Sequence, residues 1–310
     1  MNVKNTLRLV LEYKKAFKNW IYVIVHSFIY IIVKKNLSKA DIIKVKIRGG
    51  DTLRVPTGLI YFIKELIKNN GRKKGYQFDP IQGIITFPFM DRKMKMKFYE
   101  NGVSNGEFAS FSGDYNFLKP IRGNTIIDIG ANIADSSVWF AVNGASKVIA
   151  LEPYRYSYKM AIKNIEINDL KNNIILLNVG YGPNREIEVE DTKTNVGTVL
   201  KEFKGGIKIS LQTLETILTC YGEHVSGNLL LKMDCEGCEY NILDEEENTL
   251  TRFSKILIEY HNGYESIAEK LKSCGFKVEY TKPHIWYDKE TERNLVQGYL
   301  YAINEYKTTE

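Results

Sequence analysis

Hydrophobic and polar positions alternate in two different ways along this chain, and the change comes near residue 120. Beyond it, short apolar runs are separated by segments with helical periodicity, which is the pattern of a doubly wound, mostly parallel α/β sheet. The apolar runs are 125–129, 147–151, 174–179, 228–233 and 255–259, and the helical segments are 133–142, 155–167, 212–221, 238–250 and 265–273. Two last apolar runs, 276–281 and 297–303, have no clear helix between them and predict a closing antiparallel pair.

The pattern before residue 120 predicts a small α+β module over residues 41–118. Residues 42–55 alternate apolar and polar around Gly49-Gly50-Asp51, which indicates a hairpin. A helix is expected over 58–69, and strands over 83–88 and 94–99. The main α/β domain then covers residues 119–310.

Residues 1–40 form a basic, apolar segment whose longest apolar run is Trp20–Val33. These fourteen residues would make a helix of about 21 Å, too short for a hydrocarbon core of about 30 Å. Lysines flank the run, namely Lys14, Lys15 and Lys18 before it and Lys34 and Lys35 after it. Two interpretations stay open: a helix lying on an anionic membrane surface, and a core helix with solvated charged ends.

Charge is distributed unevenly and narrows the range of partners. The 310 residues carry a net charge of +6, but the first 50 carry +9, so the remainder is −3. Such a body lacks the basic footprint of a nucleic-acid-binding protein, and we expect no nucleic-acid partner. The four cysteines are too few and too dispersed for a disulfide scaffold, which predicts a cytoplasmic protein, with residues 1–40 on the inner membrane face as the peripheral alternative.

Cys235 and Cys238 form the only close cysteine pair in the sequence, CEGC. No second cysteine or histidine pair with metal-ligand spacing follows them, so neither a zinc site nor a thioredoxin-type role is expected. No metal is predicted for any other part of the chain.

The residues at the carboxyl ends of the first two predicted strands suit a nucleotide, because ligands of such sheets bind there. The first strand leads into Asp128-Ile-Gly130-Ala131-Asn132, where Gly130 permits close backbone approach and the next helix begins. Glu152 ends the second strand, 24 residues after Asp128, where it could accept hydrogen bonds from ribose hydroxyls. The loop lacks the three-glycine spacing of a dinucleotide fingerprint, so an adenosine-containing ligand is favoured.

Two later strand ends carry candidate acid–base groups. Asp234 is followed by Glu236 and Glu239, while Glu259 and His261 end the next strand. A carboxylate and an imidazole on adjacent strands could together deprotonate an acceptor hydroxyl near neutral pH. For Glu239 we predict a helix-start role, since acids complement the dipole there.

These motifs together resemble the FkbM family of S-adenosylmethionine-dependent methyltransferases. The matching stretches are TIIDIGANIADSSVWFAVNGASKVIALEP, LLLKMDCEGCEY and ILIEYHN, and the resemblance covers residues 105–303. It implies a Rossmann-like class I methyltransferase fold with seven strands, the last antiparallel, and S-adenosylmethionine as the cofactor. Where the family usually has a glycine this chain has Ala134, and its usual small or aliphatic pair is Cys235 and Cys238.

The resemblance also implies roles for individual residues. The methionine part of the cofactor would be surrounded by Asp128, Gly130, Ala131 and Asn132, its ribose held by Glu152, and its adenine or ribose side approached by Asn178 and Gly180. Asp234 would sit between cofactor and acceptor, with Glu259 and His261 on the acceptor side.

The expected function is O-methylation of a hydroxyl on a small molecule or glycan, and a lipid-linked saccharide would suit the basic N-terminus. Asp234 or His261 would take the hydroxyl proton. Three alternatives stay open: a nicotinamide-dependent oxidoreductase, a nucleic-acid methyltransferase, and a cofactor-binding membrane protein without turnover. Substrate contacts are expected from residues 72–118 and from the loops after 180 and 280.

Overall fold

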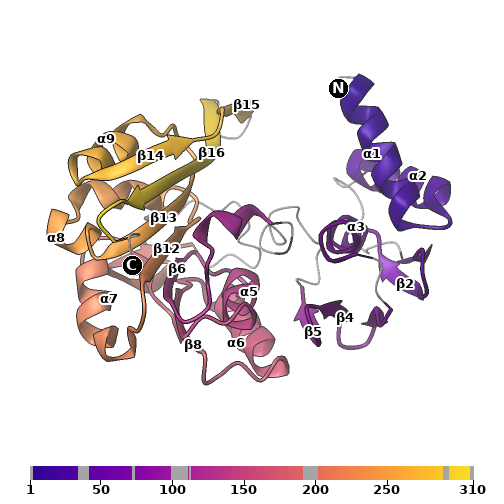
Figure 1. Cartoon of the computed structure of the whole chain (residues 1–310), viewed down its shortest axis with the longest axis horizontal. Coiled ribbons are helices and arrows are strands. Elements are labelled where there is room, and N and C mark those ends of the chain that lie inside the picture. The colour runs from indigo at the N-terminus through magenta and orange to yellow at the C-terminus, as the bar shows by residue number, and fades with distance from the viewer. Residues whose placement is uncertain are drawn as a thin grey trace. The chain divides into compact units, whose positions relative to one another are not determined.

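The computed structural model describes residues 3–33, 42–71, 74–98, 111, 113–190, 202–288 and 293–307. The chain divides into two compact units, Met1–Asp114 and Tyr115–Glu310 (Figure 1). This boundary lies four residues before the predicted start of the α/β domain at residue 119. The segment 1–40, predicted as separate, belongs to the first unit.

The described residues of unit 1 form three long helices and two small antiparallel sheets. The helices are α1 (Val3–Ala16), α2 (Trp20–Val33) and α3 (Leu59–Asn70). The hairpin predicted over 42–55 is β1 (Ile42–Lys46) with β2 (Thr52–Pro56), and a second sheet contains β3 (Gln77–Asp79), β4 (Ile84–Phe89) and β5 (Arg92–Lys97). The sequence pattern missed α1, whose Glu12 pairs with the buried Lys64 of α3 at 2.8 Å. That ion pair ties the N-terminal helix to the module.

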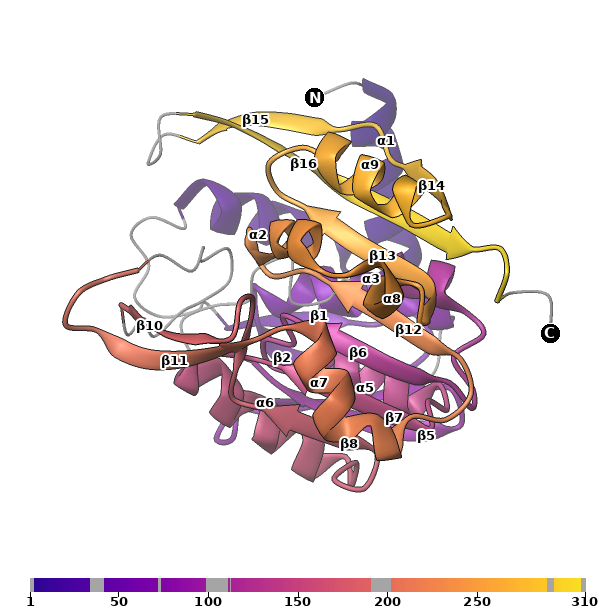
Figure 2. The same cartoon turned by 90° about the vertical axis from the view of Figure 1, so that its left-hand side faces the viewer.

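Unit 2 is built on one large sheet with the strand order β14-β16-β13-β12-β6-β7-β8 (Figure 2). The five parallel strands are β6 (Thr125–Ile129), β7 (Lys147–Leu151), β8 (Ile174–Leu177), β12 (Leu229–Met233) and β13 (Phe253–Tyr260). They are nearly continuous apolar runs because helices cover both faces. The antiparallel strands are β14 (Phe276–Tyr280) and β16 (Arg293–Asn304). The predicted seven-stranded α/β sheet and its closing antiparallel pair are confirmed, and β15 (His284–Asp288) adds to the far end of β16.

Helices pack on both faces of this sheet, with α5 and α6 on one and α7, α8 and α9 on the other (Figure 2). Their bounds are α5 (Asp135–Val142), α6 (Arg155–Ile167), α7 (Leu214–Tyr221), α8 (Glu247–Leu250) and α9 (Glu265–Ser273). The helix predicted over 238–250 is instead a 3-10 helix, η4 (Cys238–Asp244), followed by α8. The break falls at Glu245, which is extended and whose buried carboxylate accepts hydrogen bonds from Leu214 N and Tyr181 Oη.

A further small sheet was not predicted from the sequence. It contains β9 (Gly180–Tyr181), β10 (Arg185–Val189) and β11 (Ile207–Gln212). Residues 191–201 and, in unit 1, residues 99–110, where substrate contacts were expected, lie outside the described residues.

Candidate functional site

The loop after β6 lies directly against the end of β12. Gly130 has φ +77°, and a Cβ built on it would come within 1.8 Å of the carbonyl oxygen of Asp234. A side chain at this position is therefore excluded by both conformation and space. Ala134, where the family usually has glycine, also has a left-handed backbone, with φ +64°. The predicted cofactor loop and the predicted acceptor strand end are thus immediate neighbours.

A buried ion pair holds this junction together. Asp128 is fully buried, and its Oδ2 accepts hydrogen bonds from Ser136 Oγ at 2.7 Å and Ser137 Oγ at 2.6 Å. Lys232, in register with it on β12, places Nζ 3.0 Å from Asp128 Oδ1 and donates to the carbonyl oxygen of Gly130 at 3.0 Å. Burial alone would lower the pKa of Lys232, but the charges of Asp128 and Asp234 raise it above its usual value.

These contacts define where Asp128 acts. Its carboxylate faces the protein interior and pairs with Lys232, which in turn binds the carbonyl oxygen of Gly130, so Asp128 supports the Gly130 loop from inside the protein. Sequence analysis missed Lys232, although a lysine within the apolar strand LLLKM is itself a signal, because buried lysines need a partner.

The ends of β6, β7 and β8 are joined through Glu152. Its carboxylate is buried and accepts hydrogen bonds from Asn132 N at 2.8 Å and Tyr154 N at 2.9 Å. Burial raises the pKa of Glu152 to about 8, although both backbone hydrogen bonds oppose the shift. Asn178 Nδ2 donates to the carbonyl oxygen of Glu152 at 2.9 Å. The structure therefore brings three of the predicted cofactor residues onto one sheet edge.

The other two predicted cofactor residues are buried backbone positions. Ala131 donates its N–H to the carbonyl oxygen of Leu151 at 2.9 Å, which fixes the loop against β7. Gly180 lies in β9 and pairs with Leu211 of β11. Both shape the edge through the backbone.

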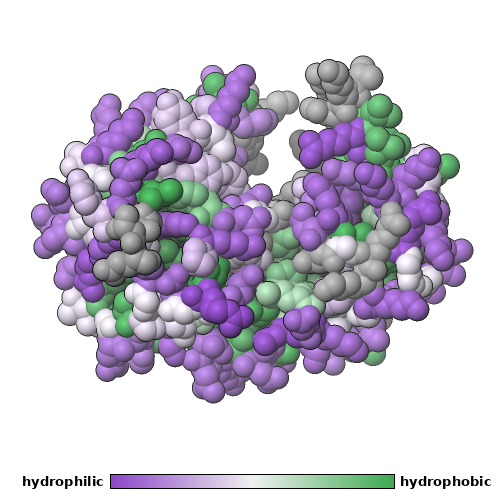
Figure 3. Space-filling model, in the orientation of Figure 1, coloured by the Kyte–Doolittle hydropathy of each residue, from purple (hydrophilic) through white to green (hydrophobic). Residues whose placement is uncertain are grey.

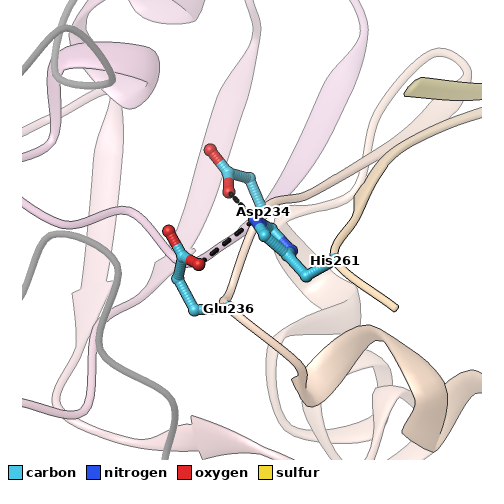
Figure 4. Close-up of side chains that lie close together, drawn as sticks. All are labelled: Asp234, Glu236 and His261. Atoms are coloured by element: carbon cyan, nitrogen blue, oxygen red, sulfur yellow. Dashed lines mark ion pairs between the residues drawn. The ribbon is translucent and has the colours of Figure 1, made fainter. Parts of the chain in front are cut away.

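His261 meets two carboxylates at the ends of β12 and β13 (Figure 4). Its Nε2 lies 3.9 Å from Asp234 Oδ1 and 3.2 Å from Glu236 Oε2. On the other side of the ring, Nδ1 lies 2.9 Å from Oε1 of the fully buried Glu239, which also accepts the backbone N–H of His261 at 3.0 Å. Glu239 thus orients the imidazole, a role that the helix-start interpretation did not include.

The carboxylates of Asp234, Glu236 and Glu239 surround the imidazole of His261, and their negative charges favour its protonated form. Burial would lower the pKa of His261, but the hydrogen bond that its ring donates to Glu239 and the charges of Glu236, Glu239 and Asp234 raise it to about 10. Glu259 lies nearby, where burial and the charge of Asp234 raise its pKa to about 8, and Gln297 Nε2 donates to its Oε1 at 2.8 Å.

One expectation from the sequence is corrected at this turn, and one cluster appears that the sequence did not reveal. Cys235 and Cys238 form a disulfide, with Cα atoms 5.5 Å apart, so the expectation of reduced cysteines without a disulfide is wrong for this pair. The turn between them, with φ +57° at Glu236 and +115° at Gly237, reverses the chain and brings them together. The sequence also showed no metal-ligand set, whereas Asp234, Glu236 and His261 place ligand atoms within 4.8 Å of one another. Spacing along the chain could not reveal it, since the residues come from two strands.

Comparison with known protein families decides the classification. Residues 128–278 match the family model described as the methyltransferase FkbM domain. Residues 128–278 form an FkbM methyltransferase domain. The match begins at Asp128 in β6 and ends at Val278 in β14, so it contains every predicted site residue. The resemblance inferred from the sequence is confirmed, and the oxidoreductase alternative is set aside.

The chain is also similar to several solved structures of methyltransferases and related proteins. Pyrococcus horikoshii TYW2, in complex with MeSAdo, is 17% identical with a TM-score of 0.38, over 89% of this chain and 98% of that chain. A candidate RNA methyltransferase from the same organism is 12% identical with a TM-score of 0.39, over 66% and 84%. Precorrin-6y C5,15-methyltransferase from Geobacter metallireducens is 14% identical with a TM-score of 0.34, over 61% and 85%. Such distant likenesses carry no argument about substrate. No curated protein sequence matches the chain.

Proposed function

We propose that this FkbM protein is an S-adenosylmethionine-dependent O-methyltransferase that acts on a hydroxyl of a small molecule or glycan. The observation that carries the proposal is the contact between the Gly130 loop and the end of β12 at Asp234. It makes the cofactor edge, with Glu152, and the acid–base cluster, with His261, adjacent parts of one site. Donor and acceptor held side by side react as in a unimolecular step.

The residues at the cofactor edge fit this cofactor. Each oxygen of the Glu152 carboxyl group accepts one backbone N–H, which leaves each oxygen able to form a second hydrogen bond with a ribose hydroxyl. The Gly130 loop and Asn132 would adjoin the methionine part. When bound, S-adenosylmethionine supplies an electrophilic methyl group. The chain would hold the acceptor hydroxyl in line with it. The cationic His261 would help to bind the hydroxyl, and Asp234 would take its proton.

Calorimetric titration with S-adenosylmethionine and S-adenosylhomocysteine tests the cofactor assignment. We expect micromolar binding by the wild type, loss of at least tenfold in affinity in Glu152→Ala, and no change in Glu166→Gln, at a partly exposed glutamate on α6. A wild-type protein that binds neither compound would contradict the proposed function. Wild-type affinity in Glu152→Ala would contradict the role of Glu152 alone.

The acceptor class is supported by charge, since residues 51–310 carry a net charge of −3. Polyanionic acceptors are disfavoured on such a surface. Transfer of labelled methyl groups to glycans and small hydroxylated compounds, compared with transfer to tRNA, tests this expectation. Labelling of tRNA in preference to every other acceptor would overturn it.

A membrane surface is proposed as a partner of unit 1, because α2 is apolar on two sides. Val23 and Ile24 are buried in the unit, whereas Ile21, Val25 and Ile29 recur at helical spacing and are 45% to 61% exposed. Hydrophobic side chains also appear on the helical part of unit 1 in Figure 3. Exposed lysines accompany them, namely Lys14, Lys15 and Lys18. The second lysine group, Lys34 and Lys35, lies outside the described residues.

This arrangement supports a helix that lies on an anionic surface with its apolar face inserted. No helix in the described part of the chain combines the length and apolar character that crossing a membrane requires. We expect co-sedimentation with vesicles containing phosphatidylglycerol, and less with phosphatidylcholine alone. The triple variant Ile21→Ser/Val25→Ser/Ile29→Ser should lose binding, while Ile81→Ser, at an even more exposed isoleucine outside α2, should retain it. Equal binding by both variants would count against the proposal.

A further inference from the structure

The imidazole of His261 has an unused nitrogen directed at two carboxylates (Figure 4). The residue is 8% exposed, and its Nε2 is buried without a hydrogen-bond partner among the described residues. Buried polar nitrogens are normally satisfied, so this one requires an explanation. Its nearest acidic oxygens, at 3.2 Å on Glu236 and 3.9 Å on Asp234, make ion-pair contacts without a hydrogen bond.

The opposite ring nitrogen is held as it is in metal-binding histidines. Nδ1 lies 2.9 Å from Glu239 Oε1, and Glu239 is itself fixed by the backbone N–H groups of His261 and Gly237. Histidines that ligate metals almost always bond their second nitrogen to a carboxylate or carbonyl oxygen, which sets the ring orientation. Here that contact turns Nε2 toward Asp234 and Glu236.

The spacing of the three ligand atoms suits a divalent cation. Ligands about 2.1 Å from one ion, at tetrahedral or octahedral angles, lie about 3 to 3.5 Å apart. The distances of 3.2 Å and 3.9 Å from Nε2 need only small side-chain rotations to reach this range. Two carboxylates with one imidazole form an oxygen- and nitrogen-donor set that suits Mn²⁺, Fe²⁺ or Zn²⁺.

We propose that Asp234, Glu236 and His261 form a divalent-cation site whose remaining coordination positions take the acceptor. Three protein ligands leave positions open, as in sites where metals bind substrate. In an octahedral site three positions stay open, and two adjacent ones suit an acceptor that chelates through the target hydroxyl and an oxygen on the neighbouring carbon, as in a vicinal diol or a 2-hydroxy acid. With the cation bound, the coordinated hydroxyl would lose its proton to water, because the cation stabilises the oxyanion. Asp234 and His261 would then serve as ligands, which replaces the direct removal of the proton by Asp234. This acceptor role rests on the proposed function, while the cation site itself does not.

Direct titration of the full chain with Mn²⁺, followed by electron paramagnetic resonance and repeated with Zn²⁺ by calorimetry, tests the site. We expect one ion per chain, with affinity at least tenfold weaker in Glu236→Gln and in Asp234→Asn. Glu239→Gln keeps all three ligands and should still weaken binding about 10- to 100-fold, since it loosens the ring. The control Glu223→Gln, at a solvent-exposed carboxylate, should bind as the wild type does. Circular dichroism spectra like those of the wild type ensure that each variant is folded.

Several results would overturn the inference. Absence of wild-type binding at 1 mM of either metal ion would exclude the site, and unchanged affinity in the folded Glu236→Gln protein would exclude this ligand set. S-adenosylmethionine binding, measured on the same samples, separates the two proposals. Cofactor binding without metal binding would reject the cation site alone, and metal binding without cofactor binding would reject the proposed function and the acceptor role with it.

Discussion

Replacing Lys232 with methionine should strongly destabilise unit 2. The side chain is 1% exposed and neutralises the fully buried Asp128 at 3.0 Å. Methionine has a similar volume, so the change leaves a buried, uncompensated carboxylate without creating a large cavity. Breaking a buried ion pair on one side costs about 3 to 5 kcal/mol. The hydrogen bond to the carbonyl oxygen of Gly130 is lost as well, so the upper end of this range is expected.

The double variant Asp128→Asn/Lys232→Met separates this cause from lost packing. A neutral amide can still accept hydrogen bonds from Ser136 and Ser137, so the double variant should be more stable than Lys232→Met by about 2 kcal/mol. Such recovery is expected only when the unpaired charge of Asp128, rather than lost packing, causes most of the destabilisation in Lys232→Met.

Native-state hydrogen exchange of the β6 and β12 amides, combined with urea unfolding, measures these differences in unit 2 itself. Lys147→Met is the matched control. This lysine lies at the start of β7, the strand next to β6, and its side chain is more exposed than that of Lys232, so the free energy of unfolding should change by less than about 1 kcal/mol. A loss below about 1 kcal/mol in Lys232→Met, or no recovery in the double variant, would refute the reasoning.

Three further predictions concern the cofactor edge. Gly130→Ala should lower the free energy of unfolding by more than about 3 kcal/mol and abolish S-adenosylmethionine binding. Gly123→Ala has a similar φ and open space around its Cβ, so it should lower the free energy of unfolding by only about 1 kcal/mol. Thermal unfolding and calorimetry distinguish the two variants. Ala134→Gly should raise stability by about 0.5 to 1 kcal/mol, because a left-handed backbone strains alanine, and a lower melting temperature would contradict this. Burial raises the pKa of Glu152 to about 8, so the folded protein holds this proton more tightly than the unfolded chain does. The free energy of unfolding should therefore fall by up to about 5 kcal/mol as pH rises from about 4.5 to 8. Glu152→Gln should remove that part of the pH dependence, and an unaltered profile in urea titrations would show that Glu152 is not its source.

The main sheet could be predicted because each parallel strand is a short apolar run with its own boundaries in the sequence. The strand ends then identified Asp234 and His261 as neighbours without any knowledge of tertiary contacts. The partners Lys232 and Glu239 could not be assigned in this way. Pairing of Lys232 with Asp128 depends on the register between strands 100 residues apart, and the role of Glu239 depends on which ring nitrogen of His261 it faces.

The turn at Glu236 is a second feature that the local sequence pattern could not predict. Glutamate rarely adopts a left-handed backbone, so nothing in CEGC predicts the reversal that closes the disulfide and directs Glu236 toward His261. The small sheet of β9, β10 and β11 was missed because β9 has only two residues and β10 and β11 are separated by a long segment.

The position of β16 determines the order in which the sheet can fold during synthesis. β16 is made after β13 and β14 yet lies between them, so both strands keep an open edge until it inserts. Open apolar edges are prone to pairing with other chains, which makes the nascent protein dependent on rapid insertion or on chaperones. Gln297, which binds Glu259, arrives on the same strand. The proposed acceptor side of the site is therefore completed only when the sheet closes, and an incompletely folded chain presents no finished site to a substrate.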